Sequence, residues 1–183
     1  MTRCWFRLCV CVALLITGLP PAAGAEVVDA SPAGFTSKNV VEIAVPADIV
    51  YATLLKVETW WDPAHTYSGD AKNLTIDARP GGCFCETWSK GSRIRHLEVI
   101  YVDPGRTIRM TGGLGPLQEL AVVGTLTWTL TESGGRTRLE QTYAVGGYRP
   151  GGLQELAPIV DGVLKTQVER LKRIVETGKP TQG

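Results

Sequence analysis

Apolar and polar residues alternate in residues 35–45 and again between residues 74 and 145, a pattern typical of β-strands with one covered face. Within residues 122–131, Leu126, Trp128 and Leu130 point to one side and four threonines point to the other. Short segments rich in glycine, proline and aspartate separate the strands, and such connections join antiparallel neighbours. The predicted strands are 35–45, 74–78, 83–88, 93–102, 107–111, 122–131 and 136–145.

Two kinds of helix are predicted around these strands. A short helix starts after Pro46 and ends near Trp60 and Trp61, and residues 64–72 form a turn or a one-turn helix. A long amphipathic helix over residues 158–177 has one apolar stripe and would be about 30 Å long. That stripe contains Val160, Leu164, Val168, Leu171 and Val175. The predicted fold is α+β, a curved antiparallel sheet of about seven strands wrapped around this helix, with two short helices after the first strand.

The first 25 residues have the features of a signal peptide. Arg3 and Arg7 precede a short apolar run over residues 8–16, and a small-x-small pattern ends at Ala25. A membrane anchor is the alternative, but the run is shorter than the about 20 residues that span a bilayer. We expect cleavage before Glu26 and an exported protein, periplasmic or secreted, with no membrane span in its mature form. The other predicted units are a flexible lead-in over 26–34, one domain over 35–177 and a tail over 178–183.

Length and composition limit the function only broadly. The chain has 183 residues, of which 44% are apolar and 20% charged, as in ordinary globular domains. The net charge is +1, and removal of residues 1–25 leaves 17 basic and 18 acidic residues. No nucleic acid partner is therefore expected, and no particular protein partner is indicated. Asn73 begins a glycosylation sequon, which matters only in a host that glycosylates exported proteins.

Cys83 and Cys85 are the two cysteines that follow the signal segment. At positions i and i+2 of a strand their Cα atoms would be about 7 Å apart, too far for an easy disulfide, so we expect free structural cysteines. The alternatives are a redox thiol pair and a soft-metal site with His65 or His96. Neither histidine has ligand spacing to the cysteines, and no metal site is predicted.

The chain has so many large aromatic side chains that burying them in a thin two-layer core would determine the shape of that core. They suggest a lined cavity, although each one taken singly fits plain core packing equally well. The candidate ligand-binding residues are Trp60, Trp61, Tyr67, Phe84, Glu86, Trp88, Arg109, Trp128, Gln141, Tyr143, Leu164 and Val168.

Glu86 alternates with Phe84 and Trp88, so the strand pattern places its carboxylate on an aromatic face. A buried carboxylate needs a partner, such as Arg109 or Gln141, or stays protonated with a raised pKa. The preferred interpretation is that Glu86 belongs to a structural polar pair. The alternative is that it acts as a general acid or base. The sequence pattern indicates no nucleophile and no second acid next to Glu86.

Four segments of the chain, together with the order of its elements, are similar to bacterial members of the polyketide cyclase/dehydrase branch of the START-like (SRPBCC) helix-grip superfamily. The segments are 60–69 (WWDPAHTYSG), 81–86 (GGCFCE), 102–106 (VDPGR) and 112–117 (GGLGPL). The resemblance covers about residues 35–176. It implies a cavity between helix and sheet for an apolar or amphipathic small molecule. The superfamily also contains lipid-transfer domains and the heat-shock ATPase activator domain, so the resemblance fixes no single function.

We therefore expect an exported protein that binds a hydrophobic or amphipathic ligand, lipid-like or aromatic. An enzyme of the cyclase or hydrolase type, using Glu86, Arg109 and either His65 or His96, is one alternative. A partner-binding module without a cavity is the other, and a filled interior would favour it. No G-x-S-x-G motif occurs, and residues 112–115 lack the lysine of a nucleotide-binding loop, so no cofactor is predicted.

Overall fold

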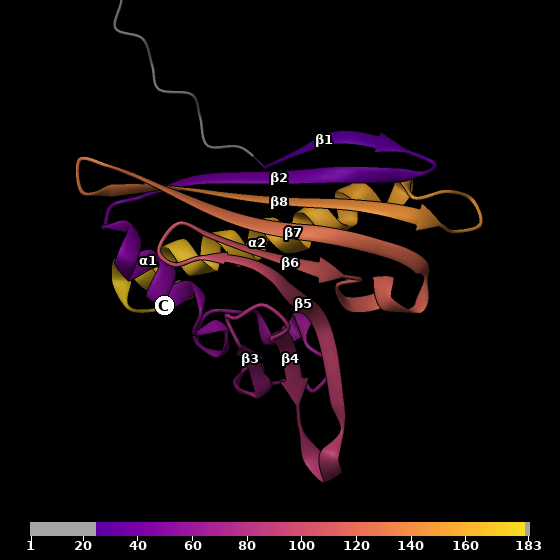
Figure 1. The fold of residues 1–183 in the computed structure, drawn as a ribbon, viewed down its shortest axis with the longest axis horizontal. Coiled ribbons are helices and arrows are strands. Elements are labelled where there is room, and N and C mark those ends of the chain that lie inside the picture. The colour runs from indigo at the N-terminus through magenta and orange to yellow at the C-terminus, as the bar shows by residue number, and fades with distance from the viewer. Residues whose placement is uncertain (1–24, 182–183) are drawn as a thin grey trace, which may run out of the picture.

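The structure, a computed structural model, describes residues 25–181 (Figure 1). The predicted signal segment lies outside the described residues except for its last residue. Eight antiparallel strands form one sheet in the order β1-β2-β8-β7-β6-β5-β4-β3. The strands are β1 (Ala25–Ser31), β2 (Gly34–Ile43), β3 (Leu74–Ile76), β4 (Cys83–Thr87), β5 (Arg93–Asp103), β6 (Thr107–Gly112), β7 (Ala121–Ser133) and β8 (Arg136–Tyr148).

Two α-helices and six short 3-10 helices complete the described chain. The α-helices are α1 (Ala47–Leu54) and α2 (Ala157–Thr177). The 3-10 helices are η1 (Val57–Thr59), η2 (Pro63–His65), η3 (Ala71–Asn73), η4 (Ser89–Gly91), η5 (Gly115–Glu119) and η6 (Gln154–Leu156). The predicted α+β helix-grip architecture is confirmed: α2 lies along one face of the curved sheet, while β5 turns away and carries β4 and β3 (Figure 1).

The eighth strand is β1, which belongs to the segment 26–34 that the sequence pattern predicts to be a flexible lead-in. That prediction is wrong as far as Ser31, because β1 pairs with β2 from Ala25 opposite Asn39 to Ser31 opposite Gly34. The free edge of β2 offers unpaired backbone groups that an adjacent segment satisfies by pairing. Because the segment contains many small residues, its sequence does not show an evident strand pattern.

The helix that begins after Pro46 ends earlier than predicted. α1 stops at Leu54 instead of continuing to the tryptophans. The indole N–H of Trp60 donates to the carbonyl oxygens of Thr53 and Leu54, at 3.0 and 3.2 Å. These carbonyls would accept from the next turn if the helix continued, so the Trp60 side chain takes the place of that turn.

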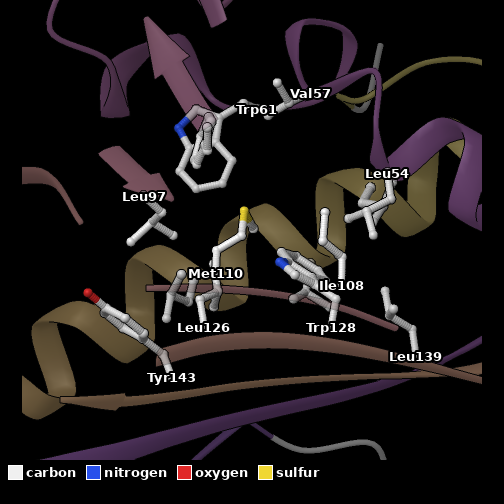
Figure 2. Close-up of a cluster of buried hydrophobic side chains, with 14 of the residues drawn as sticks. Leu54, Val57, Trp61, Leu97, Ile108, Met110, Leu126, Trp128, Leu139 and Tyr143 are labelled. Carbon is white, nitrogen blue, oxygen red and sulfur yellow. The ribbon is translucent and has the colours of Figure 1, made fainter. Parts of the chain in front are cut away.

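The core lies between α2 and the inner face of the sheet. The face predicted from the alternation in β7 is confirmed, since Leu126, Trp128 and Leu130 are at most 4% exposed. Figure 2 shows Leu126 and Trp128 on this face. Leu164, Val168 and Leu171 of the helix stripe are buried against them. α2 is capped by Gly178, whose φ of +76° is in the left-handed region that favours glycine. No helix within residues 25–181 is long and apolar enough to cross a membrane.

Candidate functional site

Four of the predicted aromatic residues form a continuous row between the sheet and α2. The ring of Trp60 lies 5.5 Å from that of Trp61 and 5.9 Å from that of Trp128, and Trp61 lies 5.2 Å from Phe84. Most of these pairs meet edge to face, the arrangement that aromatic quadrupoles prefer. The structure thus brings together residues from the loop after α1, from β4 and from β7.

The interface around this row is filled by side chains. The four aromatic residues, Leu164 and Val168 are between 0 and 4% exposed, as in a close-packed protein interior. Figure 2 shows the inward side chains of the sheet meeting the Trp61 side chain and α2. A depression of about 520 Å³ lies elsewhere, between the β5–β6 turn, the end of β7 and the first residue of α1. None of the predicted site residues lines it.

Side-chain hydrogen bonds from α2 hold the segment that carries the two tryptophans. Gln167, which is fully buried, accepts from the backbone N–H of Asp62 at 2.8 Å, and its amide nitrogen lies 3.0 Å from Nδ1 of His65. Arg170 donates to the carbonyl oxygen of Trp60 at 2.8 Å. His65 therefore has a structural partner in α2, and the WWDPAH segment forms part of the helix–sheet interface.

Glu86 is fully buried and its carboxylate has three donors. The backbone N–H groups of Tyr67 and Ser68 donate to it at 3.0 and 2.6 Å, and Nε2 of His96 lies 3.2 Å away. Burial alone would raise the pKa of Glu86, but the hydrogen bonds from Ser68, Tyr67 and His96 outweigh it and lower the pKa below its ordinary value. Glu86 is an ionised carboxylate that holds the loop after η2.

His96 is the side-chain partner of Glu86. The sequence pattern indicated His96 only as a possible metal ligand or polar residue of an enzyme, and gave Arg109 or Gln141 as the partner of Glu86. Phe84 pairs with Leu97 and Cys85 pairs with Arg95, so His96 is the extra residue of a bulge in β5. The bulge places His96 and Leu97 both in the interior, which no alternating pattern would indicate. The imidazole packs on Phe84 and Tyr67, with ring centroids 4.9 and 5.9 Å apart.

The protonation state of His96 follows from its surroundings. Burial lowers the pKa of His96 by more than the neighbouring Glu86 raises it, so the ring is neutral at pH 7. Because Nε2 faces a carboxylate, it carries the hydrogen and Nδ1 has the lone pair. Nδ1 has no hydrogen-bond partner among the described residues. A neutral imidazole supported by a carboxylate can act as a general base, although this one is only 4% exposed.

A second polar group lies on the inner face of β2 and β8, under α2. Asn39 and Gln141 are opposite each other, and the amide nitrogen of Asn39 lies 3.4 Å from Oε1 of Gln141 and from Oγ of Ser37. Ser37 donates to Asp161 of α2 at 2.6 Å. Oδ1 of Asn39 and Nε2 of Gln141 are buried and have no partner among the described residues. The alternation along β2 places Ser37 and Asn39 inward, and this signal could have identified them.

Comparison with known proteins identifies the family of this chain. The model of the family described as polyketide cyclase / dehydrase and lipid transport matches residues 35–176. The chain belongs to this family. No curated protein matches the chain at a significant level.

Solved structures resemble this member of the polyketide cyclase/dehydrase and lipid transport family in fold alone, because the three that follow are each less than 25% identical to it. DynU16, from the dynemicin biosynthetic locus, is 21% identical with a TM-score of 0.55, over 81% of this chain and 49% of DynU16, about half its length. A protein from Arthrobacter aurescens is 15% identical with a TM-score of 0.55, over 86% of this chain and 96% of that protein. CalU16 from Micromonospora echinospora is 14% identical with a TM-score of 0.51, over 87% of each chain.

Other predicted residues of this polyketide cyclase/dehydrase and lipid transport family member lie away from the row. Arg109 is on the outer face of the sheet, where it donates to Oγ1 of Thr127 at 3.1 Å and covers the ring of Tyr101 at 5.4 Å. The prediction that Arg109 partners Glu86 is therefore wrong. Trp88 follows β4 and is half-buried, and Tyr67 is 46% exposed.

Tyr143 lies at the other end of the inner face and supports the glycine-rich loop of this family member. Its hydroxyl donates to the carbonyl oxygen of Gly112 at 3.0 Å and accepts from the backbone N–H of Leu114 at 2.9 Å. Burial raises the pKa of Tyr143 to about 12, so the phenol stays protonated. The residue is fully buried, and the GGLGPL segment is a loop anchored on it.

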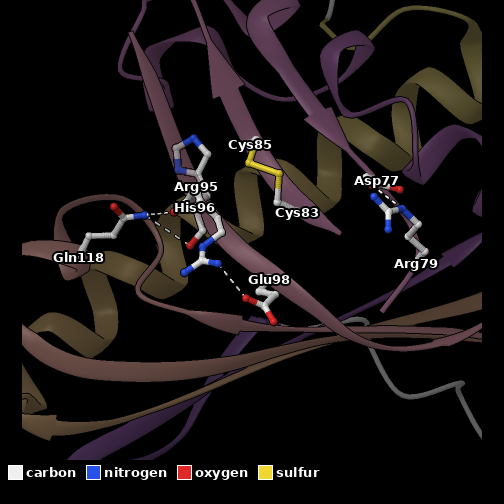
Figure 3. Close-up of a disulfide and its surroundings, with 8 residues drawn as sticks. All are labelled: Asp77, Arg79, Cys83, Cys85, Arg95, His96, Glu98 and Gln118. Atoms are coloured by element: carbon white, nitrogen blue, oxygen red, sulfur yellow. Dashed lines mark hydrogen bonds and ion pairs between the residues drawn. A yellow bond between two sulfur atoms is a disulfide. The ribbon is translucent and has the colours of Figure 1, made fainter. Parts of the chain in front are cut away.

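The prediction of free cysteines is wrong. Cys83 and Cys85 form a disulfide whose Cα atoms are 5.4 Å apart, within the range of an ordinary bridge (Figure 3). The expected separation assumed a fully extended strand, whereas β4 is contracted at Phe84 next to the bulge in β5. Within residues 25–181, no group of three or more histidine, cysteine, aspartate and glutamate side chains is arranged to hold a metal ion.

Proposed function

We propose that the protein is exported and binds a hydrophobic or amphipathic small molecule, lipid-like or aromatic, between α2 and the sheet. Membership of a family described as polyketide cyclase / dehydrase and lipid transport supports the binding of a small molecule. The signal-peptide features of residues 1–25 support export.

The observation that carries the proposal is the buried amide pair Asn39 and Gln141. An unpaired acceptor, Oδ1 of Asn39, and an unpaired donor, Nε2 of Gln141, are buried on adjacent strands within the described residues. Buried polar atoms without partners are costly, and native proteins rarely keep them without a reason. A ligand hydroxyl or carboxyl group satisfies both atoms at once, while the apolar body of the ligand packs on Trp128, which is opposite Gln141.

Entry of such a ligand requires movement, because the interface is filled. Asp161, in the N-terminal part of α2, is joined to β2 by its bond to Ser37, and breaking this bond frees the first turns of the helix from the polar pair. We expect binding to displace these turns and to change the surroundings of the buried tryptophans. Binding should therefore be slower than diffusion alone allows.

The test is a fluorescence titration of the mature protein with a fatty acid, a sterol and a planar aromatic polyketide. Trp60, Trp61, Trp88 and Trp128 are the only tryptophans after residue 25, so their emission reports the interior. At least one ligand class should shift the emission in a saturable way. The double variant Asn39→Leu/Gln141→Leu should lower the affinity for a hydroxyl- or carboxyl-bearing ligand by about tenfold, since a good buried hydrogen bond contributes on that scale.

Thr142→Val is the matched control. Thr142 follows Gln141 in β8 but points to the outer face, so its replacement should leave the affinity unchanged. Mass spectrometry of small molecules retained by protein from its native host would identify the ligand. N-terminal sequencing of the exported protein should give Glu26, and a retained N-terminal segment would contradict the export part of the proposal.

The filled interface favours a second candidate, a partner-binding module without a cavity. In that case none of the three ligand classes changes the tryptophan emission at saturating concentration. The amide pair is then a purely structural feature, and its replacement by leucines alters stability but no binding. The same titration thus distinguishes the two functions.

A further inference from the structure

The disulfide between Cys83 and Cys85 closes a loop with one intervening residue. Phe84 is buried in the core, while both cysteines are half-buried on the opposite face of β4. Figure 3 shows the disulfide between them. A disulfide stabilises a fold mainly by limiting the unfolded chain, and this effect is smallest for short loops. β4 is also paired on both sides, with β3 and β5. The disulfide therefore adds little to the constraint that strand pairing already places on β4.

The charges opposite the two cysteines are of different sign. Cys85 is paired with Arg95 of β5 and Cys83 with Glu98, and residues in such pairs have neighbouring side chains. Arg95 and Glu98 also form an exposed ion pair at 2.8 Å (Figure 3). A guanidinium favours a thiolate at Cys85, and a carboxylate disfavours one at Cys83.

The neighbours on the other side add no further charge opposite Cys85. β3 places Thr75 there. The exposed ion pair of Asp77 and Arg79, at 2.9 Å, follows β3, and the backbone N–H of Asp77 donates to the carbonyl oxygen of Cys83 at 3.0 Å. Glu86 and His96 are buried on the inner side of the sheet, so they face away from the disulfide. The difference between the cysteines therefore comes mainly from Arg95 and Glu98.

We propose that Cys83 and Cys85 form a redox-active pair that exchanges disulfides with accessible thiols, with Cys83 as the attacked sulfur and Cys85 as the leaving thiolate. The substrate class is a cysteine thiol, from a small molecule such as glutathione or from a reduced polypeptide. This activity does not depend on the ligand proposed for the interior.

The exchange takes place in two steps. A substrate thiolate attacks Sγ of Cys83, a mixed disulfide forms, and the electron pair of the broken bond stays on Sγ of Cys85 beside Arg95. A second substrate thiolate then attacks the substrate sulfur of the mixed disulfide, which releases Cys83. The two substrate thiols become one disulfide and lose two electrons, and the protein disulfide gains them. The two protons lost by the substrate thiols are taken up by the two cysteines through solvent.

The first experiment equilibrates the mature protein with mixtures of reduced and oxidised glutathione, followed by acid quenching, alkylation and mass spectrometry. The pair should pass from disulfide to dithiol within the range of glutathione ratios that can be prepared. A disulfide that stays intact in millimolar reduced glutathione overturns the proposal. The circular dichroism spectrum should be the same in both forms, because the disulfide adds little to the constraint from strand pairing. Unfolding on reduction also overturns the proposal.

The second experiment tests the assignment of roles with single-cysteine variants. At pH 7 the thiol of Cys85 in Cys83→Ser should be alkylated by iodoacetamide about tenfold faster than that of Cys83 in Cys85→Ser, because more of it is thiolate. The pH midpoint of alkylation should rise when Arg95→Gln is added to Cys83→Ser. Arg136→Gln, at the exposed first residue of β8, should leave it unchanged. Equal rates for both thiols, or no effect of Arg95→Gln, contradict the assignment.

The third experiment separates the two substrate sources. The oxidised protein is added to a reduced, unfolded ribonuclease without glutathione, and in a parallel arm to glutathione alone. Formation of disulfides in either arm, absent with the Cys83→Ser/Cys85→Ser double variant, supports the proposal and identifies the source. Failure in both arms overturns it.

Discussion

The phenolic oxygen of Tyr143 lies 3.0 Å from the carbonyl oxygen of Gly112 and 2.9 Å from the amide nitrogen of Leu114. One side chain of β8 thus satisfies two backbone groups of the loop between β6 and β7. The ring of Tyr143 reaches this loop by crossing Gly124, the β7 residue that pairs with Gly112. The close approach of the Tyr143 ring therefore explains why residue 124 is a glycine.

Tyr143→Phe should lower the free energy of unfolding by about 1–3 kcal/mol, because the backbone groups of Gly112 and Leu114 lose their partner in a partly buried position. Urea denaturation measures the change. Tyr148→Phe is the control, since Tyr148 is 71% exposed and its change should stay within about 0.5 kcal/mol. Equal effects of both variants would show that the hydroxyl contacts of Tyr143 contribute nothing special.

Gly124→Ala should destabilise the protein by about 1–3 kcal/mol, because a Cβ atom there would lie against the ring of Tyr143 in a packed core. Gly162→Ala is the matched control within α2, where a Cβ atom would meet nothing within 4 Å. It should stabilise the protein by about 0.5–1 kcal/mol through helix propensity. Thermal unfolding of the two variants should move in opposite directions, and a neutral Gly124→Ala would contradict this account of the glycine.

Leu164→Ala should cost about 2–5 kcal/mol, because Leu164 is fully buried in a packed interface. Lys165→Ala, at the next and exposed position of α2, should change the free energy of unfolding by less than about 0.5 kcal/mol. Chemical denaturation provides both values. A loss below about 1 kcal/mol at Leu164 would indicate a wall that faces open space instead of packed side chains.

Stability should fall as the solution becomes acidic. Burial lowers the pKa of His96 below its ordinary 6.5, more than Glu86 raises it, so the unfolded chain takes up this proton at higher pH than the folded chain. The free energy of unfolding therefore decreases as the pH falls below about 6.5. The hydrogen bonds of Glu86, which outweigh the effect of its burial, lower its pKa below its ordinary 4.5. Its contribution is present above that pH and is lost as the pH falls through the folded value, so both groups act in the same direction.

Urea denaturation between pH 7 and pH 4 tests this dependence. His96→Phe should remove the slope that begins below about pH 6.5, and His65→Gln should keep it, because His65 is bonded to Gln167 and lies outside the pair of Glu86 and His96. A protein that becomes more stable on acidification in this window would have His96 protonated in the fold, contrary to the expected direction.

The sequence by itself determined the strands from β2 to β8, the faces of the regular strands and the long helix, but not β1. Period-two alternation tells which side chains share a face, and it assigned Leu126 and Trp128 of β7 to the core correctly. The same rule applied to Ile108 and Met110, both buried, would have placed Arg109 outside. Helix periodicity likewise identified Leu164 and Val168, because both patterns depend on local backbone geometry alone.

Only the tertiary structure decided the features that depend on contacts between distant residues. A one-residue bulge in β5 brought His96 to Glu86, and it accompanies the contraction of β4 that joins Cys83 to Cys85. The Trp60 side chain ended α1 by bonding to its last carbonyls. A bulge shifts the alternation by one position, and a side chain can replace a backbone partner, so neither is encoded in the local period of the sequence.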